Sequence, residues 1–173
     1  LRAGVEQTDG PFCVRYPRDS TPEVVPELSK IAATKHATWE VLRHGRDFAI
    51  LAVGTMVNPA LAAAETLAAE GLDITVVNCR YIKPYDEVTL NAVLADHTHV
   101  LTVEEGTVIN GFGAHMSAVI QRLAPTVRVA VHGVPDRIIY SASRAKQLAT
   151  LGLDSTGIAA HVRALHESEA MAG

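Results

Sequence analysis

The stretch of sequence richest in potential chemistry runs from residue 100 to residue 123, VLTVEEGTVINGFGAHMSAVIQRL. An apolar run leads into Glu104 and Glu105, and the glycines Gly111 and Gly113 then open a helical pattern. Glycines between a strand and a helix are where many proteins hold a phosphate on backbone N–H groups. Such glycines can also serve packing, by letting a helix begin close against the end of a strand.

The other residues of a phosphate-binding motif are missing around these glycines. A dinucleotide-binding motif needs a third glycine, but Met116 stands at that position, and no P-loop lysine follows. The carboxylates of Glu104 and Glu105 would also repel a phosphate. We therefore interpret Gly111 and Gly113 as packing residues.

The two glutamates face opposite ways if they lie on a strand, so they cannot act together as a carboxylate pair. We expect one of them to be solvated and the other to accept a neighbouring backbone N–H. An alternative stays open, in which one carboxylate faces a ligand in the crevice at the carboxyl end of the strand.

Histidine and cysteine give no metal or redox motif. His97 and His99 fall on one side of an extended segment, but no third ligand is marked, so we interpret them as solvated loop residues. Cys13 and Cys79 have no paired spacing, which fits a reducing cytoplasm without disulfides or zinc.

A second candidate anion site lies near the beginning of the chain, in RYPRD, where Arg15 and Arg18 flank Pro17 at the end of a strand-like run. A guanidinium group is a good phosphate ligand because its fork matches two oxygens at once. Two arginines on a surface are common, however, so these residue types alone do not define a site.

Composition excludes several classes of protein. The 173 residues carry 15 Lys+Arg against 19 Asp+Glu, a net charge of −4 with no basic run, so nucleic acid is not an expected partner. No apolar stretch approaches the roughly 20 residues of a membrane span, and no signal peptide is visible, so we expect a cytoplasmic protein without a membrane partner. The first residue is Leu1, not Met, and the strand-like run at residues 12–16 has nothing before it to pair with, so we interpret the chain as a fragment of a longer protein.

The elements that would position these residues follow an alternating pattern. Residues 17–37 contain three prolines and no clear period, as a linker does. Beyond them, apolar runs predict strands, and stretches of helical period separate them; Gly71 would end the first helix, Asp86 would cap the second, and Asp154 or Ser155 would cap the last. Strand–helix alternation predicts an α/β fold with a mostly parallel sheet covered by helices on both faces. The expected strands are 39–45, 48–54, 74–82, 99–105 and 127–135.

Together, the motifs RYPR, RYIKPYDE, VPD and LGLD…GI strongly resemble the C-terminal part of the 1-deoxy-D-xylulose-5-phosphate synthase family. The resemblance covers nearly the whole chain in the right order, whereas VEEG and GFG also occur in other transketolase-like enzymes. It implies a three-layer α/β/α transketolase C-terminal domain with a five-stranded, mostly parallel sheet. The implied division is the tail of the pyrimidine-binding second domain (1–18), a linker (19–37), the C-terminal domain (38–168) and a short tail (169–173).

The resemblance also implies a function for the parent enzyme. That transferase uses thiamin diphosphate and Mg²⁺ to condense pyruvate with glyceraldehyde 3-phosphate, with loss of carbon dioxide, for isoprenoid, thiamin and pyridoxol biosynthesis. The family's metal motif and catalytic groups would lie upstream of this chain. We therefore expect the fragment to bind no cofactor or metal, to be inactive alone, and to serve structure and assembly beside the first two domains of a homodimer.

The resemblance carries over one site residue. Arg18 matches the second arginine of the family's RYPRG motif, which contacts the phosphate of the aldehyde substrate. Asp19 stands where the family has glycine, and its carboxylate would either pair with Arg18 or weaken its hold on an anion.

Two other functions remain as alternatives. The chain could be the C-terminal domain of a 2-oxo acid dehydrogenase β-type subunit, which docks a partner acyltransferase, although RYPR and LGLD argue against it. It could also be a free-standing nucleotide-binding module, for which stabilisation by nucleotides would be the sign.

Overall fold

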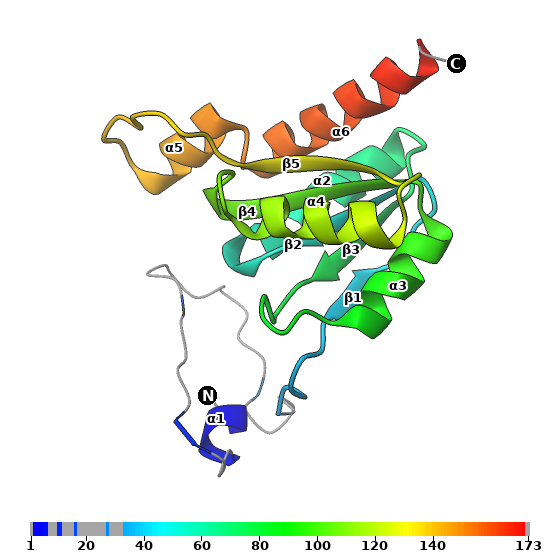
Figure 1. The fold of residues 1–173 in the computed structure, drawn as a ribbon. Coiled ribbons are helices and arrows are strands. Elements are labelled where there is room, and N and C mark those ends of the chain that lie inside the picture. Colours follow the sequence, from blue (N-terminus) through cyan, green and yellow to red (C-terminus); the bar gives the residue numbers. More distant parts are fainter. Residues whose placement is uncertain (1, 7–9, 12–15, 17–26, 28–32, 172–173) are drawn as a thin grey trace.

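The computed structural model describes residues 2–6, 10–11, 16, 27 and 33–171 (Figure 1). Residues 12–15 of the expected strand and most of the expected linker lie outside the described residues. The helices and strands are α1 (Arg2–Glu6), β1 (Glu40–Arg43), β2 (Phe48–Ala52), η2 (Gly54–Met56), α2 (Val57–Ala69), β3 (Ile74–Asn78), α3 (Glu87–Asp96), β4 (His99–Thr107), α4 (Phe112–Leu123), β5 (Arg128–Val134), α5 (Arg144–Leu151) and α6 (Ser155–Ala170).

Five strands form one sheet in the order β1-β3-β2-β4-β5. The contacts β3–β2, β2–β4 and β4–β5 are parallel, and β1 alone pairs antiparallel, on β3. The predicted α/β class with a five-stranded, mostly parallel sheet is therefore confirmed. The antiparallel edge strand brings the start of β1, at Glu40, opposite Asn78 at the end of β3.

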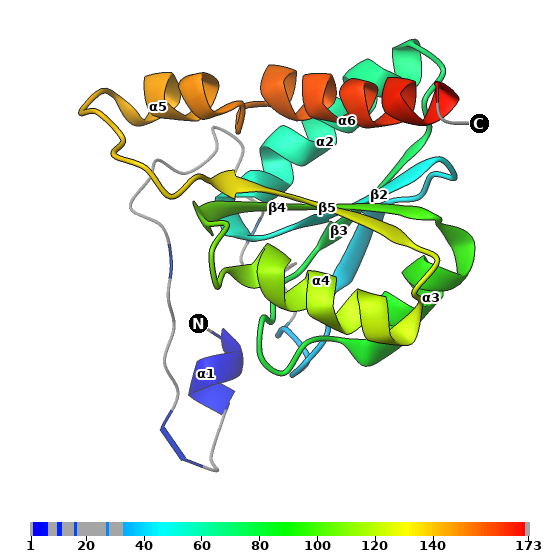
Figure 2. The same ribbon diagram turned by 45° about the horizontal axis from the view of Figure 1, so that its top comes forward.

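Helices cover both faces of the sheet, with α2, α5 and α6 on one face and α3 and α4 on the other (Figure 2). The strand FAILA of β2 is buried throughout because it lies in the middle of the sheet. Phe48, Ile50 and Ala52 pack in the core under α2 and α6, while Ala49 and Leu51 pack in the core with α3 and α4. An apolar run without alternation is typical of a strand covered on both faces.

The helix ends follow the predicted chemistry. The Asp86 carboxylate accepts the backbone N–H of Thr89 at 3.0 Å and caps α3. Gly71 has φ +91° just beyond α2, a backbone conformation that glycine adopts without strain. Of the two candidate caps for α6, the carboxylate of Asp154 is the one that accepts, from the N–H of Gly157 at 2.8 Å.

Several sequence-based details differ in the structure. The strand expected at residues 74–82 ends at Asn78. The helical pattern AHMSAVIQRLA predicts a helix from Ala114, but α4 begins two residues earlier, at Phe112. In α2, helical spacing predicts that Ala68 faces the core, but Ala68 is exposed and Ala63 is buried instead, because this helix is rich in alanine and its apolar stripe is poorly defined. None of the helices in the described part of the chain is both long and apolar enough to cross a bilayer.

Candidate functional site

The place where an open parallel sheet usually binds a ligand lies between β2 and β4. The helix that follows β2 covers one face and the helix that follows β4 covers the other, so the chain diverges at the carboxyl ends of these two neighbouring strands. Crevices at such positions are the usual ligand sites of open α/β sheets. Thr55 follows β2 here, and Glu104 and Glu105 lie near the end of β4.

Glu104 occupies the position that an anion would take. Its side chain is buried, and its two carboxylate oxygens accept the backbone N–H groups of Phe112 at 3.0 Å and Gly113 at 2.8 Å. These N–H groups belong to the first turn of α4, where the helix dipole favours negative charge. The anion site at this helix N-terminus is thus filled by a carboxylate of the chain itself.

The two glycines of GFG are needed for this close approach. A Cβ atom on Gly111 would lie 2.1 Å from the carbonyl oxygen of Thr107, and one on Gly113 would lie 2.4 Å from the side chains of Thr102 and Val131. Their interpretation as packing residues is confirmed, because a side chain at either position requires its neighbours to shift.

Glu105 differs from the solvated carboxylate expected from the sequence. Its oxygens accept Nε and Nη2 of Arg144 at 2.8 and 2.5 Å, and Oε2 also accepts the hydroxyl of Thr55 at 2.6 Å. The hydrogen bond from Arg144 lowers the pKa of Glu105, and that from Thr55 acts in the same direction. This half-exposed pair connects β4 to α5 and to the turn after β2.

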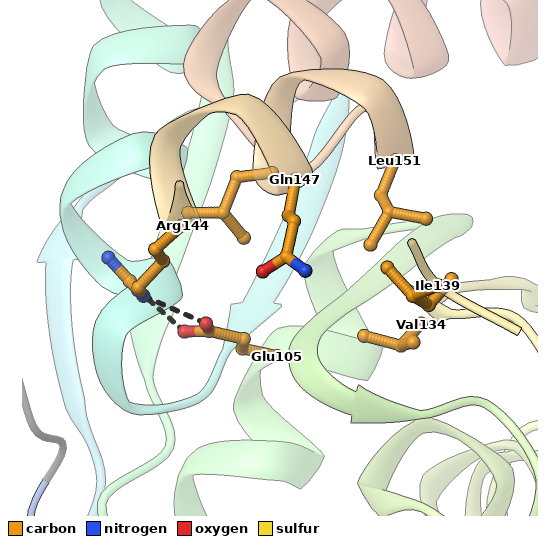
Figure 3. Close-up of a pocket in the computed structure, with 7 residues that line it drawn as sticks. Glu105, Val134, Ile139, Arg144, Gln147 and Leu151 are labelled. Atoms are coloured by element: carbon orange, nitrogen blue, oxygen red, sulfur yellow. Dashed lines mark hydrogen bonds and ion pairs between the residues drawn. The ribbon is translucent and has the colours of Figure 1, made fainter. Parts of the chain in front are cut away.

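A shallow cavity of about 220 Å³ lies beside this ion pair (Figure 3). Val134, Ile139, Leu148 and Leu151 form its apolar wall, and the Glu105–Arg144 pair and Gln147 form its polar side. The volume is below the roughly 300–1,000 Å³ typical of small-molecule sites.

The sequence interpretation of His97 is wrong. This side chain is buried at the end of α3, and its two ring nitrogens face the carbonyl oxygens of Val93 at 3.0 Å and Gly45 at 3.2 Å. It joins α3 to the turn before β2. His99, in β4, is half-buried and packs on Phe48 with 5.1 Å between ring centroids. The two histidines therefore serve packing.

Other candidate groups are not organised for chemistry in the described part of the chain. Cys79 is buried and has no disulfide partner there, and desolvation raises the pKa of its thiol well above the ordinary value, so it is a poor nucleophile. Among the described residues, no three His, Cys, Asp or Glu side chains are grouped to hold a metal ion. Arg15, Arg18 and Cys13 lie outside the described residues, so the predicted phosphate contact is not tested by the structure.

Arg144 and Thr55 are the site residues that sequence reasoning missed. Arg144 is 39 positions from Glu105, and nothing in either segment marks the other as its partner. The sequence gave only an indirect indication that these residues meet. In a parallel sheet, the segments that follow neighbouring strands lie at the same edge.

Comparison with known proteins gives a consistent result. The family model described as the transketolase C-terminal domain matches residues 37–158. A 1-deoxy-D-xylulose-5-phosphate synthase of an Azoarcus species is 40% identical over 158 residues, which cover 91% of this chain and 25% of that protein. The synthase of Gloeobacter violaceus is also 40% identical, over 92% of this chain and 25% of its own length. The chain thus spans about a quarter of the length of the curated relatives it matches.

A solved structure supports the fold. A split gene transketolase, described as an inactive beta4 tetramer, superimposes with a TM-score of 0.71 at 29% sequence identity. The match covers 86% of this chain and 46% of that one.

Proposed function

Because the chain belongs to the transketolase C-terminal domain family, and is similar over nine-tenths of its length to 1-deoxy-D-xylulose-5-phosphate synthases, we propose that it is the C-terminal domain of such a synthase. The observation that carries the proposal is the 40% identity over 91% of this chain, which corresponds to only a quarter of the relative. The parent is a transferase that condenses pyruvate with glyceraldehyde 3-phosphate and releases carbon dioxide, for isoprenoid, thiamin and pyridoxol biosynthesis.

The described residues do not fit the cofactors of that reaction. Thiamin diphosphate needs donors for its diphosphate and a metal ion to bridge it, but the N-terminus of α4 is already filled by the carboxylate of Glu104. The described part of the chain also offers no cluster of metal-ligating side chains. The proposed role of this chain is therefore structural, with thiamin diphosphate and Mg²⁺ held by the first two domains of a cytoplasmic homodimer.

The same geometry weighs against a free-standing nucleotide-binding module. In such a module the helix N-terminus after a parallel strand would be open to a phosphate. Here it is occupied by the carboxylate of Glu104, and the neighbouring Glu105 is paired with Arg144.

Calorimetry with thiamin diphosphate and Mg²⁺ tests the structural role. We expect no binding to the 173-residue chain at millimolar cofactor, and binding together with synthase activity in the full-length parent. One-to-one binding to the short chain with a Kd near about 1 μM, equivalent to about −8.2 kcal/mol, would show that a cofactor site lies within it. A parent that binds the cofactor but does not convert pyruvate and glyceraldehyde 3-phosphate would refute the reaction.

We also propose that Arg18 of the full-length parent contacts the phosphate of glyceraldehyde 3-phosphate. Its support is the match of RYPR to the family motif and the suitability of a guanidinium group for a phosphate. Such a contact would orient the aldehyde through a group that does not react.

A further inference from the structure

We propose that the bond between Asn110 and Gly111 is a site of spontaneous covalent modification. The side chain of Asn110 closes a cyclic imide with the nitrogen of Gly111, and the imide opens to an aspartyl or an isoaspartyl residue. The isoaspartyl product loosens the first turn of α4, which begins at Phe112. The modification involves this chain and water alone, so it does not depend on the reaction of the parent enzyme.

The reaction joins two groups that are neighbours in the chain. Solvent hydroxide takes the proton of the Gly111 nitrogen, which attacks the side-chain carbonyl carbon of Asn110; a C–N bond forms, and the bond to the side-chain nitrogen breaks and releases ammonia. Water then opens the imide. Attack at the former side-chain carbonyl gives aspartate, whereas attack at the backbone carbonyl gives isoaspartate, in which the main chain runs through the former side chain. The net change is loss of NH₃ and gain of H₂O, with no oxidation or reduction.

The structure leaves both reacting groups without restraint. Asn110 and Gly111 lie in the bend between β4 and α4, and Asn110 is exposed, with φ +57°. Asparagine adopts this left-handed conformation more readily than most residues. Closing the ring requires the Asn110 backbone to rotate, and no hydrogen bond of Asn110 to another described residue opposes the rotation. The N–H of Gly111 likewise donates to no acceptor in the described part of the chain, and glycine has no Cβ to shield its nitrogen.

The three other asparagines of the chain are not followed by such a nitrogen. Asn58 precedes a proline, which has no N–H. The N–H that follows Asn78 donates to the carbonyl oxygen of Ala52 at 2.9 Å. Asn91 is exposed, but the residue after it lies inside α3, where backbone N–H groups are bonded within the helix. The fold therefore distinguishes Asn110 from the other asparagines.

The packing around Gly111 determines what the modification does. Isoaspartate adds a carbon atom to the main chain just before Gly111, where a Cβ atom would already clash with the carbonyl oxygen of Thr107 and the carboxylate of Glu104. The added length therefore has to be absorbed by a shift of the first turn of α4. The N–H groups of that turn hold the Glu104 carboxylate at 3.0 and 2.8 Å. The aspartyl product leaves the main chain unchanged, so only isoaspartate disturbs these hydrogen bonds.

Peptide mass spectrometry of the 173-residue chain, after incubation at mildly alkaline pH, tests the modification. We expect the peptide with Asn110 to gain about 1 Da, as NH₂ is replaced by OH, at least about tenfold faster than the peptides with Asn78 and Asn91, whose following N–H groups must first leave a hydrogen bond. Asn91 is the matched control because it is also exposed. A gain at Asn110 in urea-unfolded chain but not in folded chain would show that the fold protects the bond, and would overturn the proposal.

Urea unfolding before and after the incubation measures the consequence for α4. The first measurement checks that the chain is folded at the start. We expect the isoaspartyl fraction to unfold at a lower urea concentration than the unmodified chain. N110D carries the new charge without the added carbon and should follow the unmodified chain. If the isoaspartyl fraction unfolds together with N110D, the added carbon does not loosen α4.

N110S is the variant that cannot form the imide. It should pass through the incubation with its urea midpoint unchanged, because its hydroxyl side chain has no carbonyl for the Gly111 nitrogen to attack. An equal loss of stability in N110S would assign the damage to another part of the chain and overturn the link to the Asn110–Gly111 bond.

Discussion

At the scale of single residues, the adjacent side chains of Glu104 and Glu105 have different roles. Glu104 points inward and accepts two N–H groups of the first turn of α4, where it is hidden from water. Glu105 points outward and pairs with Arg144 in a half-exposed position. The alternation of side chains along a strand is the physical reason for the difference.

The first prediction follows from that difference in burial. Glu104→Gln places an amide nitrogen against a backbone N–H, which leaves a buried donor unpaired and should lower the free energy of unfolding by about 1–3 kcal/mol. Glu105→Gln is the matched control and should cost less than about 1 kcal/mol, because a half-exposed ion pair contributes little. Urea unfolding at pH 7 measures both. Equal losses would mean that the helix N-terminus does not depend on this carboxylate.

The second prediction concerns Arg18 in the full-length parent. Arg18→Ala should raise the KM for glyceraldehyde 3-phosphate by about 10- to 150-fold, since a charge-assisted contact contributes about 1.5–3 kcal/mol. The KM for pyruvate should stay nearly unchanged, because pyruvate carries no phosphate. Steady-state kinetics should show little effect of the substitution when D-glyceraldehyde replaces the natural acceptor.

Arg15→Ala is the internal control for that experiment. An acceptor-specific loss in Arg15→Ala but not in Arg18→Ala would move the phosphate contact to the first arginine of RYPR. Equal effects on both substrates in both variants would make the segment structural.

At the scale of elements, the packing of α6 on the sheet places titratable groups in a half-buried contact. The rings of His132 in β5 and His161 in α6 lie 4.6 Å apart between centroids. Nε2 of His132 is 2.7 Å from the carbonyl oxygen of Gly152, in the turn that joins α5 to α6. Desolvation lowers the pKa of His161, and the neighbouring His132 lowers it further.

The third prediction is that this contact makes stability depend on pH. A histidine whose pKa is lowered in the folded state binds its proton more readily when unfolded, so its contribution to stability is present above about pH 6.5 and is lost as pH falls below that value. We expect thermal unfolding between pH 7.5 and 5.5 to show a smaller loss in His161→Gln than in the unmodified chain. His44→Gln, at an exposed position, should follow the unmodified chain. Parallel curves for all three proteins would refute the role of His161.

At the scale of the whole molecule, two apolar cores, one on each face, make the sheet and its helices a unit. One core joins α2, α5 and α6 to the sheet and the other joins α3 and α4, with Trp39 at the beginning of the second. Every strand of the sheet lies at or after residue 40. The unit therefore contains the partners that its buried side chains need.

The fourth prediction is that this unit folds without the residues before it. A chain shortened to begin at Thr38 should unfold cooperatively at a temperature within a few degrees of the 173-residue chain, which circular dichroism can measure. We retain Thr38 and Trp39 because the latter anchors β1 to Tyr81 and Asp86. A non-cooperative transition would show that the first 37 residues belong to the core.

Local chemistry made much of the fold predictable from sequence. Some features depend only on residues close together in the chain, so the sequence predicts them without the structure. They are the apolar run of β2, the cap at Asp86 and the glycine at position 71. The alternation of strand and helix patterns predicted the mostly parallel sheet, and the resemblance to a known family implied the same five-stranded arrangement. The prediction of a buried Ala68 failed because the alanine-rich apolar stripe of α2 is a weak local pattern.

The sequence by itself determined that the chain is an alternating α/β domain, that Gly111 and Gly113 serve packing, and which family it resembles. Only the tertiary structure decided that Glu105 meets Arg144 and that His97 is buried. The physical reason is how far apart in the sequence the interacting residues lie. Helix caps and strand patterns depend on neighbours in the chain, whereas an ion pair across 39 residues depends on how strands and helices come together in space.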